Sequence, residues 1–236
     1  MICLSLSHSA IGELKRLVQR YAKEADILEI RLDLLANPME MDFDQLVTPE
    51  SPPLIFTNRK AEEGGRFKGD EKQRIRLLMR AIQAGANYID IELATRQDLR
   101  DGLIEKAHNN ETKVIVSYHN FESTPESDEI LKIFNRMAKS GADIIKIVTM
   151  ATDPLDFIKL APVFQMSQKS SLPVIAFCMG EKGRFSRIFS LNLGSFLTFA
   201  APDSSTQTAP GQIPIGLMKK IFSLLQATSE NKEVPF

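Results

Sequence analysis

Eight short apolar segments, rich in β-branched residues, recur along the whole chain and constrain its fold more than any other feature. Runs of this length are typical of buried β-strands, and most of the segments between them carry apolar residues at helical spacing. The predicted strands cover residues 2–6, 27–31, 54–57, 88–93, 114–118, 144–148, 174–178 and 195–199. They start about 28 residues apart on average, close to one strand and one helix per repeat of an eightfold barrel. We therefore predict an α/β fold, a single (β/α)8 barrel of the TIM type.

The alternation continues without a break in composition, so we expect one domain over residues 1–236. The last segment, 227–236, is polar, and we expect it to be a frayed tail. An open, doubly wound parallel sheet is the alternative fold. A nucleotide-binding sheet of that kind would carry a G-x-G-x-x-G loop after an early strand, and the sequence has none. The barrel is therefore the favoured prediction.

Composition and charge exclude several classes of function. The chain has 29 Lys+Arg against 30 Asp+Glu, a formal net charge of −1, so it has no field that would gather nucleic acid or anionic lipid. No stretch approaches the roughly 20 apolar residues of a membrane span, and the first residues lack the features of a secretory signal. Cys3 and Cys178 belong to no cluster with zinc-ligand spacing. We expect a cytoplasmic protein with reduced thiols and with no nucleic-acid or membrane partner.

The second and third predicted strands end in charged residues, at the edge of a barrel where its chemistry gathers. Period-two alternation places Glu29, Arg31 and Asp33 on one face of the second strand. Arg59 shares a face with Thr57 at the end of the third strand by the same parity. Buried charges of this kind form structural ion pairs or bind a ligand. Both interpretations stay open on these residues alone.

The fifth and sixth strands each carry one residue suited to acid–base or covalent chemistry. His119 ends the fifth strand, and an imidazole transfers protons in both directions near neutral pH; a plain hydrogen bond is the alternative role. Lys146 lies inside the sixth strand among branched aliphatic residues, where lysine is rare. We expect those neighbours and nearby arginine charges to favour the neutral, nucleophilic amine. The alternative is a lysine that reaches solvent from the edge of a strand. This interpretation is weaker because Lys146 lies inside the apolar run and not at its end.

The loops after the seventh and eighth strands indicate what the site binds. The planar guanidinium of Arg187 matches a carboxylate, and Thr208 and Gln212 supply neutral hydrogen bonds. Pro210 removes a backbone donor that a phosphate site would use. These residues favour a small polyhydroxy acid. Together with a lysine and a histidine they suit imine chemistry, which requires no metal and no organic cofactor.

Several short motifs also occur in a characteristic order along the chain. They are Glu29-Ile30-Arg31, Arg59-Lys60-Ala61-Glu62-Glu63-Gly64-Gly65, Asp90-Ile91-Glu92-Leu93 followed by Ile115-Val116-Ser117-Tyr118-His119-Asn120, Lys146, Met179-Gly180 through Ser186-Arg187, and Ala209-Pro210-Gly211-Gln212. In these motifs the sequence resembles the type I 3-dehydroquinate dehydratases over essentially its whole length. One departure is Thr208, which stands where the family usually has serine. The resemblance implies a (β/α)8 barrel and a lyase of the shikimate pathway, which leads to chorismate and the aromatic amino acids.

The resemblance also implies a role for each residue that matches a family motif. Lys146 would form a Schiff base with the C3 ketone of 3-dehydroquinate, and His119, oriented by Glu63, would move protons at C2 and at the departing C1 hydroxyl. The product would be 3-dehydroshikimate, and no cofactor would take part. Substrate binding would fall to Arg187, Thr208 and Gln212 at the carboxylate and to Glu29, Arg31 and Arg59 at the ring hydroxyls, the last three also tuning Lys146.

Two other functions remain open from the sequence. A class I aldolase of the same barrel type also uses a lysine imine, but its substrates are often phosphorylated, which the arginine-based carboxylate site argues against. A non-catalytic barrel that binds an acidic metabolite would account for the arginines but not for a lysine kept inside a strand. Members of the family are often homodimers, so the resemblance also points to a homodimer. No helix face in the sequence marks a subunit contact.

Overall fold

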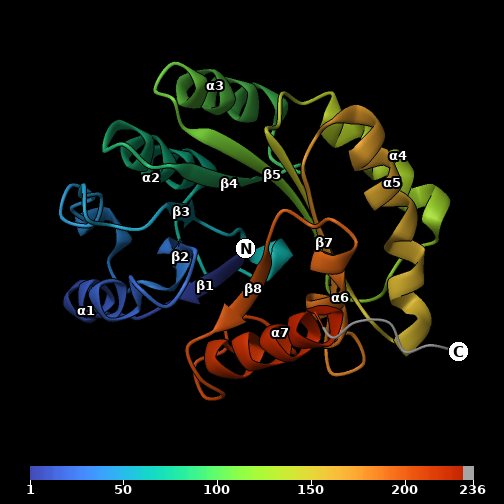
Figure 1. The fold of residues 1–236 in the computed structure, drawn as a ribbon. Helices are drawn as coiled ribbons and strands as arrows, with labels where there is room; N and C mark the ends of the chain where they lie inside the picture. Colours follow the sequence, from blue (N-terminus) through green and yellow to red (C-terminus); the bar gives the residue numbers. More distant parts are fainter. Residues whose placement is uncertain (231–236) are drawn as a thin grey trace, which may run out of the picture.

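The structure, a computed structural model, describes residues 1–230 and shows a parallel sheet curled into a barrel (Figure 1). The strands lie in the order β7-β6-β5-β4-β3-β2-β1-β8-β9. Their bounds are β1 Ile2–Leu6, β2 Ile27–Arg31, β3 Leu54–Thr57, β4 Tyr88–Glu92, β5 Lys113–Asn120, β6 Ile144–Met150, β7 Val174–Met179, β8 Thr198–Ala201 and β9 Ile213–Pro214. The predicted α/β barrel is confirmed, and the first three strands have the predicted bounds.

Helices surround the strands on the outside of the barrel (Figure 1). The α-helices are α1 Ile11–Tyr21, α2 Glu71–Gln83, α3 Gln97–His108, α4 Ser127–Ala138, α5 Ala161–Ser170, α6 Ser186–Asn192 and α7 Ile215–Glu230. Short 3-10 helices are η1 Leu32–Leu34, η2 Pro38–Glu40, η3 Ala61–Glu63 and η4 Pro154–Leu160.

The predicted (β/α)8 barrel has a helix after every strand, and one connection departs from this. Between β2 and β3 the described chain holds η1 and η2 and no α-helix, so residues 1–230 contain seven α-helices. This connection contains Pro38, Pro49, Pro52 and Pro53. Each proline lacks a backbone donor and its ring clashes with a preceding helical turn, which prevents a continuous helix.

The barrel has a seam between β7 and β8. Among the described strands these two share no ladder, while β8 pairs with β1 and β7 pairs with β6. The seam is bridged where Val174 O accepts hydrogen bonds from Phe196 N at 2.7 Å and from Ser195 Oγ at 3.4 Å. The eighth strand itself begins at Thr198, three residues later than predicted, because its pairing with β1 starts there, opposite Ile2.

The barrel interior is apolar at its amino end and polar at its carboxyl end. Inward-facing side chains at the amino end form a separate buried cluster that includes Cys3, Ile27, Ile55, Ile115 and Ile144. Two residues further along the same strands, the same face carries polar groups, because successive side chains of a strand alternate between the two faces. The outward faces pack against the helices in a larger apolar core. The apolar layer thus closes the barrel beneath the polar one.

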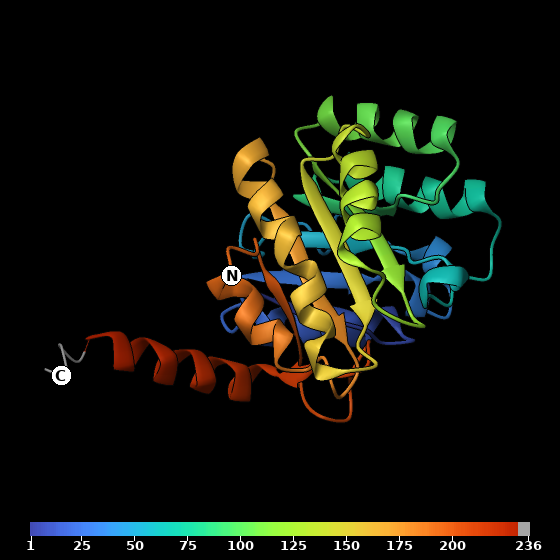
Figure 2. The same ribbon diagram turned by 90° about the vertical axis from the view of Figure 1, so that its right-hand side faces the viewer.

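The last helix, α7, projects away from the body of the barrel (Figure 2). Its first turns are anchored by Ile215 and Met218, which are buried. The helix runs to Glu230, so residues 227–230 of the expected tail are helical, and residues 231–236 lie outside the described residues. None of the described helices is both long and apolar enough to span a membrane.

Candidate active site

One cavity opens at the carboxyl end of the barrel, and its wall brings together all nine residues that the sequence analysis selected. They are Glu29, Arg31, Arg59, Glu63, His119, Lys146, Arg187, Thr208 and Gln212. Apolar residues and a glycine complete the wall: Gly64, Phe121, Val148, Phe177, Met179, Phe199 and Ala209. The parallel register explains this gathering, because it sets Glu29 beside Ser5 and Lys146 beside Ser117 at one level of the interior.

Lys146 is only 4% exposed, and its amine lies among charged groups. Nζ is 2.9 Å from Asp90 Oδ2 and 3.7 Å from Glu29 Oε1, and it sits 4.2 Å from the centre of the Phe199 ring. The expected aliphatic surroundings are therefore only partly right: Ile144 and Val148 share the inward face of β6 with Lys146, but carboxylates contact its amine. The neighbouring isoleucines, Ile145 and Ile147, belong to the core between strands and helices, because alternation along β6 turns them away from the amine.

Asp90 and Arg59 form the charged floor beneath the lysine. Arg59 Nη2 donates to Asp90 Oδ2 at 2.7 Å, and its Nη1 donates to Glu92 Oε1 at 3.0 Å and to Ser117 Oγ at 2.6 Å. Burial acts to raise the pKa of Asp90, but the charges of Arg59 and Lys146 outweigh it and hold that pKa far below its ordinary value. Asp90 is therefore a permanent carboxylate. Within residues 1–230, no group of three or more His, Cys, Asp or Glu side chains is placed to hold a metal ion.

His119 is held by Glu63 through two hydrogen bonds. Glu63 Oε2 lies 2.9 Å from His119 Nδ1 and accepts from the His119 backbone N–H at 3.0 Å. Burial, with the charges of Arg59 and Lys146, holds the pKa of His119 well below its usual 6.5. Burial also raises the pKa of Glu63 from 4.5 to about 7, against the opposing charge of Arg59. The imidazole is therefore neutral near pH 7, and Nε2 is the ring nitrogen that Glu63 leaves free.

Two glycines allow Glu63 to reach the histidine. Gly64 follows η3 with φ +78°, in the left-handed region that side chains disfavour. Gly65 packs against the chain itself, since a Cβ there would lie 1.8 Å from Arg59 O. In the sequence this loop stood out only as part of the motif Arg59 to Gly65. Its glycines serve a tight turn that places the carboxylate of Glu63 beside β5.

Arg187 is a buried guanidinium without a carboxylate partner among the described residues. It is 1% exposed, its guanidinium carbon lies 4.5 Å from the centre of the Phe177 ring, and Nη2 donates to Pro210 O at 3.0 Å. Its Nε has no hydrogen-bond partner. Burial lowers the pKa of Arg187 from 12.5 to about 9. An unpaired buried cation is costly, so this position is suited to an anionic ligand.

The loop between β8 and β9 folds over the cavity and is tied to its floor. Thr208 Oγ1 donates to Ser5 Oγ at 2.9 Å, and Ser5 Oγ donates to Glu29 Oε2 at 2.5 Å. Gln212 Oε1 accepts from the backbone N–H of Thr208 at 2.7 Å. Gly211 is required here, because its φ is +75° and a Cβ would lie 2.4 Å from Gly180 O. The two glycine-containing motifs of the sequence thus meet in space.

For several residues of the charged floor, no role was predicted from the sequence. Asp90 and Glu92 were quoted only as part of a motif, and Ser5 was not considered. The alternation that separated Glu29 and Arg31 from their apolar neighbours applies equally to β4, where Asp90 and Glu92 alternate with isoleucines. Applying that rule to every strand would have found both carboxylates.

Comparison with known proteins agrees with the motifs. The model of a family described as type I 3-dehydroquinase matches residues 2–229. A 3-dehydroquinate dehydratase of Desulfotalea psychrophila is 38% identical over 222 residues, which cover 94% of this chain and 96% of that protein. A 3-dehydroquinate dehydratase of Methanocaldococcus jannaschii is 33% identical over 225 residues, which cover 95% of this chain and 99% of that protein.

Solved structures agree as well. The type I 3-dehydroquinate dehydratase of Clostridium difficile superposes with a TM-score of 0.87 at 29% identity, covering 96% of this chain and 92% of that one. The family predicted from the motifs is therefore confirmed. This chain belongs to the type I 3-dehydroquinase family, whose members are hydro-lyases.

Proposed function

We propose that this chain removes water from 3-dehydroquinate to give 3-dehydroshikimate through a Schiff base on Lys146, without a cofactor, as a step of the shikimate pathway. The observation that carries the proposal is the wall of one cavity, which combines a buried amine, a carboxylate-held imidazole and an unpaired guanidinium. The dehydratase of C. difficile was solved with covalently modified comenic acid, which supports covalent chemistry in this family.

Imine formation begins when Lys146 gives up a proton and its Nζ lone pair attacks the C3 carbonyl carbon. The carbonyl oxygen takes up two protons and leaves as water, which yields an iminium ion with one positive charge. Asp90 Oδ2 and Glu29 Oε1, at 2.9 and 3.7 Å from Nζ, are placed to balance that charge. The same two carboxylates thus face an ammonium before the reaction and an iminium during it.

His119 then acts as base and as acid. Nε2 accepts the proton from C2, and the electrons of that C–H bond form the C2–C3 double bond of an enamine. The enamine electrons expel the C1 hydroxyl, which leaves as water with the proton that Nε2 returns. Hydrolysis of the product iminium frees Lys146, so no oxidant or reductant is consumed. The low pKa of His119 suits this role, because it keeps the imidazole neutral and ready to accept a proton.

Substrate binding is assigned by charge. Arg187 pairs with the substrate carboxylate, which would use the Nε that now lacks a partner. Thr208 and Gln212 close over the carboxylate from the loop after β8. The ring hydroxyls meet Glu29, Arg31 and Arg59, whose charges are already balanced within the barrel by ion pairs with Lys146, Asp33 and Asp90.

The direct test mixes pure protein with 3-dehydroquinate and follows the ultraviolet band of the conjugated enone product. Borohydride added during turnover should fix the ligand on Lys146, which peptide mass spectrometry would locate. Sugar phosphates, the substrates expected for an aldolase, serve as controls and should be left uncleaved. Turnover of a sugar phosphate without turnover of 3-dehydroquinate would replace this proposal with the aldolase. Binding without any turnover would point to the non-catalytic barrel.

Replacing Arg187 with methionine should lower activity and raise stability together. The loss of charged hydrogen bonds to the substrate carboxylate, each worth about 1.5–3 kcal/mol, should raise KM about 10- to 100-fold. Removing an unpaired buried charge while keeping similar volume should raise the free energy of unfolding by about 1–4 kcal/mol. Steady-state kinetics and urea unfolding measure the two effects. Arg184→Met, at an exposed arginine paired with Glu181, is the control and should change neither. A destabilised Arg187→Met protein would contradict the proposal.

Replacing Glu63 with glutamine should change the pH profile of kcat/KM. Above pH 7 the carboxylate is ionised and strengthens the hydrogen bond to His119 Nδ1, so the variant should lose about 1.4 kcal/mol, or about tenfold. As pH falls through 7, Glu63 takes up a proton and becomes as neutral as glutamine, so the ratio of the two enzymes should approach one. His119 stays neutral over this range because its pKa is lowered. A ratio that does not change between pH 6 and pH 8.5 would contradict the assignment.

We also propose that the chain forms a homodimer, as the resemblance implies. Exposed leucines on α7, Leu217 at 52% and Leu224 at 59%, and the half-exposed Phe189 on α6 support a contact on this side of the barrel. Sedimentation equilibrium measures the oligomeric state directly, and a monomer at micromolar concentration would dismiss this proposal.

A further inference from the structure

A row of alternating charges crosses from helix α2 to the reactive amine. Arg74 Nη1 donates to Glu92 Oε2 at 2.7 Å, and the other oxygen of Glu92 accepts from Arg59 at 3.0 Å. Arg59 in turn donates to Asp90 at 2.7 Å, and the same Asp90 oxygen accepts from Lys146 at 2.9 Å. Each carboxylate in the row is therefore shared by two cations, and the inner cation, Arg59, by two carboxylates.

Arg74 is the outer end of this row and does not line the cavity. It is 1% exposed and belongs to α2, whose first turn is fixed by a capping box between Asp70 and Gln73. Its guanidinium is fully used: besides Glu92 it donates to both oxygens of Glu71, to Thr95 Oγ1 at 2.9 Å and to a backbone carbonyl. Packing alone does not require so many charged contacts, since a leucine or methionine would fill a similar volume.

Three cations and two carboxylates alternate along the row, so a change of charge at its outer end affects the lysine. Glu92 is 0% exposed, and its charge is met by Arg59 and Arg74 together. If Arg74 lost its charge, Arg59 would have to serve two carboxylates alone. Asp90 would then be less well balanced and would hold a proton on the neighbouring amine more strongly. In a weakly screened interior such charge effects extend past the nearest neighbour.

We propose that Arg74 and Glu92 are positioning residues that set the pH at which Lys146 forms its imine, by fixing the charge balance of Asp90 from outside the substrate cavity. This inference rests on the proposed Schiff base at Lys146. Neither residue touches the reacting atoms, and both act through Arg59 and Asp90.

Other titratable groups also face the lysine and must stay unchanged in a test. They come from four strands and from the segment that follows β3, and they comprise Cys3, Glu29, Arg59, Glu63, Asp90 and His119. None of them needs to be altered to change the charge of the row. Variants at Arg74 and Glu92 therefore isolate the remote contribution.

The test measures how fast cyanoborohydride fixes 3-dehydroquinate on the protein, by mass spectrometry, from about pH 6 to about pH 10. Arg74→Met removes a positive charge, so half-maximal trapping should move to higher pH by about half a unit or more. Glu92→Gln removes a negative charge and should move it to lower pH by a similar amount. The double variant Arg74→Met with Glu92→Gln restores the net charge of the row, and its midpoint should return toward that of the parent protein.

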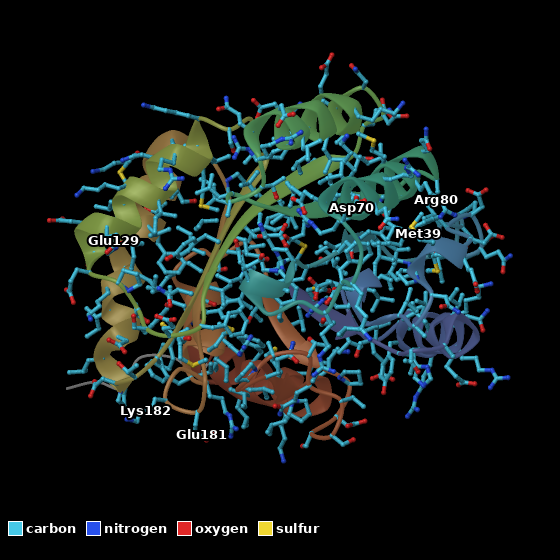
Figure 3. All side chains as sticks on the ribbon, turned by 180° about the vertical axis from the view of Figure 1, so that it is seen from behind. Met39, Asp70, Arg80, Glu129, Glu181 and Lys182 are labelled. Atoms are coloured by element: carbon cyan, nitrogen blue, oxygen red, sulfur yellow. The ribbon has the colours of Figure 1, made fainter. Side chains whose placement is uncertain are left out.

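Two controls separate charge from structure. Arg74→Lys keeps the charge while it loses the forked contacts, so it should keep the parent midpoint even if it unfolds at lower temperature. Arg80→Met removes an arginine from the far end of the same helix, where it bonds to the carbonyls of Met39 and Met41 and to no carboxylate (Figure 3). Its midpoint should not change.

The possible results are distinct. Shifts in opposite directions for the two single variants, reversed in the double variant, would support the inference. Unchanged midpoints, or shifts in the same direction, would overturn it and leave Arg74 a structural residue. If the parent protein is itself not trapped, the Schiff base proposal fails, which is a different result. Circular dichroism of each variant confirms that the folded protein is being compared.

Discussion

Replacing Lys146 with alanine is expected to lower kcat by about 10⁴-fold or more and to abolish covalent trapping of the substrate. No other amine among the residues that line the cavity is placed to form the imine. The change also leaves Asp90 and Glu29 without their shared cation, so thermal unfolding should be measured beside turnover. Enone absorbance measures turnover, and intact-protein mass after borohydride reduction measures trapping.

Two matched variants make this result specific. Lys146→Arg keeps a cation between the carboxylates but supplies no nucleophilic amine, so it should be as inactive as the alanine variant while losing less stability. Lys113→Ala, at the exposed amino end of the adjacent strand β5, should keep full activity and full trapping. A Lys146→Ala protein that retains turnover within tenfold of the parent would refute the Schiff base at this position.

Replacing His119 with alanine should lower kcat by about 10²- to 10⁴-fold, the usual contribution of a positioned acid–base group. The expected result differs from that of Lys146, because the amine is still present. Imine should form and persist, so borohydride should still fix the substrate on Lys146 while little enone appears. Rapid mixing followed by mass spectrometry measures the accumulated adduct.

The control for this prediction is His108→Ala. His108 is a half-exposed histidine on α3 whose Nε2 lies 3.0 Å from Asp143 Oδ2, at the amino end of β6, whereas the cavity opens at the carboxyl ends of the strands. Its replacement should leave kcat unchanged. If the His119→Ala protein turned over normally, or if it formed no adduct while remaining folded, His119 would not be the group that moves protons at C2 and C1.

Much of the fold follows from local patterns in the sequence. Short β-branched runs at regular intervals predicted the strands, because a strand buried on both faces requires continuous apolar residues. The eighth strand was placed three residues early, since Thr198–Ala201 is defined by its partners β1 and β9 and ends in two alanines with little strand preference. The missing helix between β2 and β3 was signalled by prolines whose effect was not weighed.

The site was predictable as a set of residues but not as an arrangement. Motifs identified the cavity wall, whereas the surroundings of Lys146 were misread from its neighbours in the chain. Ile145 and Ile147 are adjacent in sequence and face the other side of the sheet, while Asp90 is 56 positions away and touches the amine. Contacts between strands depend on register, which a single sequence does not display. For the same reason Arg74 on α2 gave no signal of its link to the site.

The seam between β7 and β8 determines where the barrel should open locally. Arg187 follows one of these strands, and Thr208 and Gln212 follow the other, so the groups assigned to the carboxylate straddle the place where the wall lacks a ladder. Few backbone hydrogen bonds cross this gap, at Val174 O and from Gly180 N to Pro210 O, so amides that face it should exchange with deuterium before those shared by β5 and β6. Bound ligand would then slow exchange along the gap, because it would add contacts between the two sides to the one that Arg187 makes with Pro210 O.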